Sequence, residues 1–104
     1  MIAPSKDLEK QVREIEKRFA GEVVGIRYSV GDDWSGDPGI FFKVLLTDAA
    51  SRREVIRDIA YRVEWALADI VFLDSPDYFP YVNYRSESEQ EKMKDPAWPS
   101  LTTF

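Results

Sequence analysis

Three aspartates, Asp32, Asp33 and Asp37, are the side chains whose types and spacing could do chemistry. They fall within the stretch GDDWSGDPG, residues 31–39, between two segments with strand-like composition. Carboxylate oxygens are the ligands that Mg²⁺ and Mn²⁺ prefer, and enzymes that transfer phosphoryl groups hold such ions with nearby aspartates. One interpretation of this stretch is therefore a metal site for nucleotidyl or phosphoryl transfer.

The same stretch has two further interpretations. Glycine, aspartate and proline are the residues of tight turns, so the segment could simply connect two strands. It is long for a hairpin loop, however, and long loops in compact domains are often functional. Trp34 stands at its tip. A large aromatic side chain is costly to leave in water, so this position also favours contact with a protein partner.

The composition limits the chemistry that this chain can perform. Its 104 residues, of which 44% are hydrophobic and 13% aromatic, suffice for one domain with its own core. The absence of cysteine and histidine excludes disulfides, thiol nucleophiles and cysteine-based zinc sites, and it removes the commonest general base. The net charge of -5 argues against nucleic acid as a partner, and no residue pattern indicates a cofactor.

The apolar segments are too short for insertion into a membrane. The first residues lack the apolar core of a signal peptide, and no apolar run approaches the roughly 20 residues of a membrane span. We therefore expect a cytoplasmic protein that does not bind membranes.

The first half of the chain predicts a helix followed by a hairpin. Ser5 is suited to cap a helix with one apolar stripe. Alternation with a period of two predicts strands over 22–30 and 40–47, paired antiparallel. The residues assigned to buried faces are Leu8, Val12, Ile15 and Phe19 on the helix, Val24, Ile26, Tyr28 and Val30 on the first strand, and Ile40, Phe42, Val44 and Leu46 on the second.

A long second helix is predicted after the hairpin. Ser51 and Glu54 fit a capping box, in which the hydroxyl and the carboxylate satisfy the first free backbone amides. The apolar spacing continues to about Val71. Its buried stripe is expected to contain Ile56, Ile59, Ala60, Val63, Leu67 and Ile70.

The last third predicts an edge strand and a short helix. Residues 78–85 have strand composition, but Pro80 lacks the amide that a central strand needs and restricts them to an edge. Ser86 and Glu89 fit a second capping box, for a helix near 87–94.

The order α-β-β-α-β predicts an α+β fold. We expect a two-layer sandwich in which two helices cover one face of a three-stranded, mostly antiparallel sheet. Residues 1–85 would form this single domain, and residues 86–104 would add the short C-terminal helix and an extended tail.

Aromatic residues on the long helix predict a docking surface. Tyr61 and Trp65 fall opposite the buried stripe, on the face that should meet solvent. Tyrosine and tryptophan are enriched at interaction hot spots. Either another protein covers them, or the C-terminal segment folds back onto them with Trp98 or Phe104. In the first case Trp98, set between two prolines, would itself contact a partner.

The open face of the predicted sheet is a second candidate surface. It would show Arg27, Phe41 and Lys43, together with Leu45 and either Tyr84 or Arg85. Basic and aromatic side chains interleaved on a sheet can bind single-stranded RNA. The apolar side chains equally suit a homodimer or another protein. The acidic net charge favours a protein.

Part of the hairpin loosely resembles minimal nucleotidyltransferases. Those enzymes have Gly-Ser after the first strand and a metal-binding Asp-x-Asp on the second. Here Ser29-Val30-Gly31 stands near the place of the first motif, but Phe41-Phe42-Lys43 occupies the place of the carboxylates. The resemblance therefore implies a degenerate nucleotidyltransferase-like protein whose active site has been lost.

The motifs WSGDP, FFKVLLTD and YRSESEQ followed by DPAW, between residues 34 and 98, resemble a family of small uncharacterised bacterial proteins. That resemblance implies a small partner of a second gene product, such as an antitoxin that neutralises a HEPN-type ribonuclease toxin. An acidic antitoxin would be steered towards the basic surface of such a toxin.

We therefore predict a non-enzymatic protein–protein interaction module, an antitoxin or accessory subunit of a small bacterial two-gene system. The alternatives are a metal-dependent or degenerate nucleotidyltransferase-like protein and an RNA-binding module that uses the open sheet. The residues expected to contact a partner are Trp34, Tyr61, Trp65, Trp98, Arg27, Phe41 and Lys43.

Overall fold

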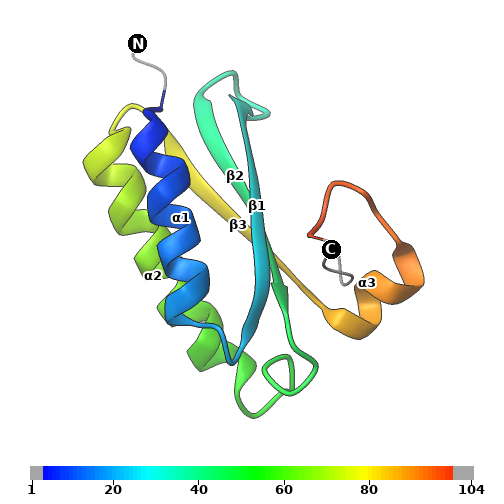
Figure 1. The fold of residues 1–104 in the computed structure, drawn as a ribbon. Coiled ribbons are helices and arrows are strands. Elements are labelled where there is room, and N and C mark those ends of the chain that lie inside the picture. Colours follow the sequence, from blue (N-terminus) through cyan, green and yellow to red (C-terminus); the bar gives the residue numbers. More distant parts are fainter. Residues whose placement is uncertain (1–3, 100–104) are drawn as a thin grey trace.

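The computed structural model describes residues 4–99 and has two layers. Helices α1 and α2 lie side by side against one face of a three-stranded sheet, and α3 follows the last strand at the other side (Figure 1). This arrangement confirms the predicted α+β sandwich. The elements are α1 (Lys6–Arg18), β1 (Val23–Asp32), β2 (Pro38–Leu46), α2 (Ile56–Asp74), β3 (Phe79–Ser86) and α3 (Glu87–Met93).

The strands are ordered β1-β2-β3, and the sheet is mixed. β1 and β2 pair antiparallel as predicted, with Arg27 opposite Lys43. β3 pairs parallel to β2, with Tyr81 opposite Phe41. The parallel pairing follows from the crossover through α2, which brings the chain back to run in the same direction as β2. Pro80 lies on an edge strand, as expected from its missing amide.

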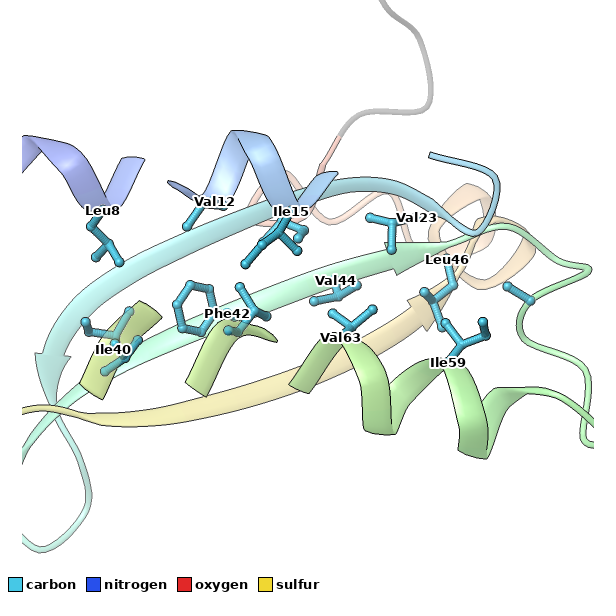
Figure 2. Close-up of a cluster of buried hydrophobic side chains, with 14 of the residues drawn as sticks. Leu8, Val12, Ile15, Val23, Ile40, Phe42, Val44, Leu46, Ile59 and Val63 are labelled. Atoms are coloured by element: carbon cyan, nitrogen blue, oxygen red, sulfur yellow. The ribbon is translucent and has the colours of Figure 1, made fainter. Parts of the chain in front are cut away.

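The core lies between the sheet and the two long helices. Alternate residues of β2 point into it, and Phe42, Val44 and Leu46 have no more than traces of exposed surface. Figure 2 shows Val12 and Ile15 of α1 above these strand side chains in the view, and Ile59 and Val63 of α2 below them. Burying each large apolar side chain stabilises the fold by about 1.5–3 kcal/mol. The predicted face of β2 is confirmed.

One predicted face of β1 is shifted by a bulge. The register changes between Val23 and Gly25, so Val23 and Ile26 both belong to the buried cluster although they are three residues apart. Val24, which strict alternation assigned to the core, is exposed. A bulge adds one residue to a strand and thereby reverses the alternation on one side of it.

The second helix begins later than the sequence pattern predicts. α2 starts at Ile56 and has no side-chain cap, and residues 48–55 form turns instead. Because the helix starts at Ile56, Ser51 is not its N-cap and the predicted capping box with Glu54 is wrong. The hydroxyl of Ser51 donates to the carbonyl oxygen of Thr47 at 2.9 Å. The helix continues to Asp74. No helix within residues 4–99 is both long and apolar enough to cross a membrane.

The other two predicted caps are confirmed. The Ser5 hydroxyl accepts a hydrogen bond from the backbone amide of Asp7 at 3.2 Å at the start of α1. Ser86 and Glu89 form a complete capping box at α3, with both side-chain-to-backbone bonds at 3.1 Å. α3 therefore starts directly at the end of β3, which directs the following residues over the sheet face that α1 and α2 leave open.

Candidate functional site

The loop between β1 and β2 is shorter and more ordered than its composition suggests. The strands extend to Asp32 and from Pro38, so residues 33–37 alone connect them. One carboxylate oxygen of Asp33 accepts hydrogen bonds from the Ser35 amide at 2.9 Å, the Ser35 hydroxyl at 2.8 Å and the Asp37 amide at 2.9 Å. This carboxylate therefore fixes the turn that carries Trp34.

The second carboxylate oxygen of Asp33 joins the loop to β3. It accepts a hydrogen bond from the Tyr81 hydroxyl at 2.8 Å. The hydrogen bonds from the Ser35 and Tyr81 hydroxyls lower the pKa of Asp33 to about 2. The same bond raises the pKa of the Tyr81 hydroxyl, because ionisation would place two negative charges together. Asp33 thus stays ionised near neutral pH and acts as an acceptor that holds the loop.

Three aromatic rings surround that of Tyr81 on the sheet face opposite the long helices. The ring of Tyr81 stacks on Phe41, with centroids 5.1 Å apart and an interplanar angle of 12°. Phe79 lies 5.0 Å and Trp34 5.5 Å from Tyr81, both tilted. We call Trp34, Phe41, Phe79 and Tyr81 the aromatic platform. Trp34 is 85% exposed and Phe79 is 56% exposed, so the platform presents a large apolar surface to solvent.

A glycine lies beneath this platform. Gly39 is buried, and a Cβ atom there would lie 3.1 Å from Cε2 of Tyr81 and 3.2 Å from Cζ of Phe41. The missing side chain lets both rings lie flat over the strand, the packing by which aromatic neighbours cover a glycine in a sheet. Gly39 therefore sets the position of the two central rings.

Two basic residues extend the platform across the sheet. Arg27 and Lys43 are direct partners in the β1–β2 register and share a depression with Phe41. The guanidinium of Arg27 donates to the carbonyl oxygen of Pro96 at 2.9 Å. Sequence reasoning placed Arg27, Phe41 and Lys43 on one face, and the structure brings them together there.

The other half of this sheet face is covered by the chain itself. Trp98 is only 6% exposed and packs on the guanidinium of Arg85, 4.3 Å from the ring centroid. Arg85 also donates to Gln90 at 2.8 Å, and Gln90 donates to the carbonyl oxygen of Asp95 at 2.7 Å. This cover leaves Leu45 fully buried. Trp98 therefore has little surface to offer a partner.

Tyr61 and Trp65 lie on a different surface. Both are exposed on α2, with ring centroids 6.1 Å apart, on the outer side of the helical layer. The C-terminal segment, as far as Pro99, lies over the opposite sheet face and does not cover them. Phe104 lies outside the described residues. The residues predicted to contact a partner therefore fall into three groups. Tyr61 and Trp65 lie on α2, Trp98 is buried, and the others lie on or beside the platform: Trp34, Arg27, Phe41 and Lys43.

The described residues offer no metal centre. Within residues 4–99 no three Asp, Glu, His or Cys side chains are grouped so that they could hold an ion. Asp33 is engaged by Ser35, Asp37 and Tyr81, and Asp32 stands at the end of β1. The geometry of this loop therefore favours a scaffold for Trp34 over a metal-dependent active site.

Sequence reasoning missed Phe79 and Tyr81, the two platform residues on β3. It left open whether Tyr84 or Arg85 faces the open side. Arg85 does, while the Tyr84 hydroxyl donates to the carbonyl oxygen of Ala60 on the helical side. Counting back by two from Arg85 gives Asn83, Tyr81 and Phe79, so strand alternation alone would have found both aromatic residues.

No protein-family model, curated protein or solved structure matches this chain.

Proposed function

We propose that this protein is a non-enzymatic protein-binding module, an antitoxin or accessory subunit of a small bacterial two-gene system, and that the aromatic platform is its docking surface. The observation that carries the proposal is the exposure of Trp34. Its side chain is 85% exposed although the loop beneath it is fixed by several hydrogen bonds. An ordered and uncovered tryptophan is a typical anchor of a protein interface.

The platform is organised before any partner arrives. Asp33 and Tyr81 tie the loop to β3, and Gly39 lets the rings pack flat. Binding then requires less ordering of side chains and loops, which is one of the main costs of association. The arrangement therefore suits specific docking better than a mobile loop would.

The acidic residues at the loop end of the platform favour a basic partner surface there. Asp32 and Asp37 are exposed on either side of Trp34 in the chain, and the whole chain has a net charge of -5. Such a rim accelerates the approach of a positively charged protein and contributes to specificity. A ribonuclease toxin, which must present a basic surface to RNA, is a partner of this kind.

The test is binding of the partner that co-purifies with the chain at its native expression level. We expect Trp34→Ala to weaken that binding about 30-fold or more, as for an interface hot spot, while the fold is retained. Leu73→Ala, which removes an apolar side chain of α2 that is 86% exposed, is the matched control and should bind normally. Wild-type affinity in both Trp34→Ala and Tyr81→Ala would refute the proposal.

Single-stranded RNA is the second candidate ligand, favoured by Arg27 and Lys43 beside Phe41. Bases would stack on the platform while the two cations contact phosphates. This candidate predicts binding of an oligonucleotide that falls steeply as salt is raised. If no oligonucleotide binds at low salt, a protein partner is left as the ligand of the platform.

A further inference from the structure

The outer face of α2 presents three large aromatic side chains to solvent. Tyr61, Trp65 and Phe72 are 62%, 55% and 53% exposed. Their spacing of four and seven residues places them on one line along the helix, opposite the buried stripe of Val63 and Leu67. We call these three residues the α2 stripe. The proposed platform does not use it: α2 covers one face of the sheet (Figure 1), whereas Phe41 and Tyr81 alternate with the core residues that face α2 and therefore lie on the other face.

A small side chain interrupts the large ones along the α2 stripe. Ala68 lies between Trp65 and Phe72, and its small side chain leaves a depression lined by these residues and Glu64. In an antiparallel pair of identical helices, the position of Trp65 on one helix lies opposite that of Ala68 on the other. The indole of each copy would therefore meet the depression of its neighbour.

The charged residues beside the α2 stripe are arranged so that two antiparallel copies would bring opposite charges together. Arg62 and Asp69 are exposed on the same flank, two helical turns apart, and both line the groove beside Tyr61 and Trp65. An antiparallel pair centred between Trp65 and Ala68 brings Arg62 of each copy to within two residues, about 3 Å along the helix axis, of the position opposite Asp69 of the other. The long arginine side chain can span this offset, which gives two symmetric ion pairs. A parallel pair would instead place like charges together, which costs free energy. Among residues 4–99, the ion pair that Arg62 forms is an exposed one with Asp58 at 3.3 Å.

We propose that a second copy of this chain docks on the α2 stripe, with the two α2 helices antiparallel about a two-fold axis between Trp65 and Ala68. Such an interface is isologous, so one patch supplies both halves. Large-to-small packing and the order of Arg62 and Asp69 favour a copy of this chain over a foreign protein. The dimer would leave both aromatic platforms free and would therefore be bivalent for their partner.

The test measures the mass of the intact chain in solution by sedimentation equilibrium over a range of concentrations. We expect a dimer for the wild type and a dimerisation constant about 100-fold weaker for Trp65→Ala, because each substitution acts twice in the symmetric interface. Trp34→Ala is the matched control, since it makes the same change on the other side of the molecule. It should dimerise normally, which separates this proposal from that of the platform.

Charge exchange tests the orientation of the helices. Arg62→Asp and Asp69→Arg should each weaken the dimer about tenfold by creating two repulsive pairs, and the double variant should restore it. Lys10→Asp, on the exposed side of α1, is the charge control. Far-UV circular dichroism confirms that each variant is folded.

Three results would overturn the proposal. A wild-type chain that stays monomeric at every concentration would show that the α2 stripe serves another protein or none. A dimer unaffected by Trp65→Ala would place the interface elsewhere. A folded double variant of Arg62 and Asp69 that fails to recover dimerisation would refute the antiparallel arrangement.

Discussion

Replacing Trp98 by alanine should destabilise the whole fold, although this tryptophan lies in the C-terminal segment. Its side chain is 6% exposed and packs on Arg85 over the sheet. Truncation of a buried aromatic residue to alanine typically costs 3–5 kcal/mol, and the lost contact with the guanidinium accounts for about 0.5–1 kcal/mol of such a cost. Because Trp98 lies at the rim of the fold, we expect the lower end, about 3 kcal/mol.

The assay is urea unfolding followed by far-UV circular dichroism, with Trp34→Ala and Trp65→Ala as controls. These two tryptophans are exposed, so at a protein concentration low enough for every variant to be monomeric the same change should alter the free energy of unfolding by less than about 0.5 kcal/mol. Hydrogen exchange adds a spatial readout. In Trp98→Ala, the amides of residues 94–99 and of β2 near Leu45 should exchange faster, because the cover over Leu45 is loosened.

A double-mutant cycle identifies the contact itself. Arg85→Met and Trp98→Ala remove the two partners, and their coupling free energy should be about 0.5–2 kcal/mol. If Trp98→Ala costs no more than the changes at Trp34 and Trp65, the indole is not packed on the sheet and the division of this face into a covered and an open half is wrong.

The platform allows two further predictions. Gly39→Ala places a Cβ atom 3.1 Å from the Tyr81 ring and 3.2 Å from Phe41, so the ring resonances of both should shift in NMR spectra. Its free energy of unfolding should change by less than about 1 kcal/mol, since overpacking and the reduced entropy of the unfolded chain offset each other; unchanged ring resonances would contradict the packing. Because folding lowers the pKa of Asp33 from 3.8 to about 2, its ionised form stabilises the ordered loop fully above about pH 4, and this stabilisation is lost as the pH falls through 2. The indole resonance of Trp34 should therefore be constant down to about pH 3 and shift near pH 2, a transition that Asp33→Asn should abolish; a midpoint near 3.8 would show that the hydrogen bonds are absent.

The parts of the fold that depend on local periodicity could be predicted from the sequence. The alternation of Ile40, Phe42, Val44 and Leu46 and the stripe of Leu8, Val12 and Ile15 correspond directly to buried faces, because burial repeats with the period of the element. The start of α2 could not be predicted in this way. Residues 48–55 form turns, in which the Ser51 hydroxyl donates to the carbonyl oxygen of Thr47, and sequence spacing does not reveal whether such a local bond or a helix cap forms.

The platform depends on pairing between distant segments, which is why only half of it was predicted. Trp34 and Phe41 can be recognised as candidates from their own positions in the sequence. Their neighbours Phe79 and Tyr81 reach them only because β3 pairs parallel to β2 and places Tyr81 opposite Phe41. The register of two strands separated by a helix is decided by packing of the whole sandwich and is not encoded in either strand alone.

The two halves of the open sheet face differ in how their apolar side chains are covered, and this difference supports the proposal that the platform binds a partner. Near Arg85 the chain provides its own cover, and Trp98 over that end leaves Leu45 without exposed surface. Near Gly39 the described chain provides none, and Trp34 stays exposed on a loop that Asp33 holds in place. The apolar side chains at the Arg85 end of this face are buried by the chain itself, whereas those at the Gly39 end are ordered and exposed. An ordered, exposed apolar surface of this kind is expected of a docking site. Burial of apolar surface is favourable at both ends. Trp98 of the chain itself achieves it at one end, and we expect another protein to bury Trp34 at the other.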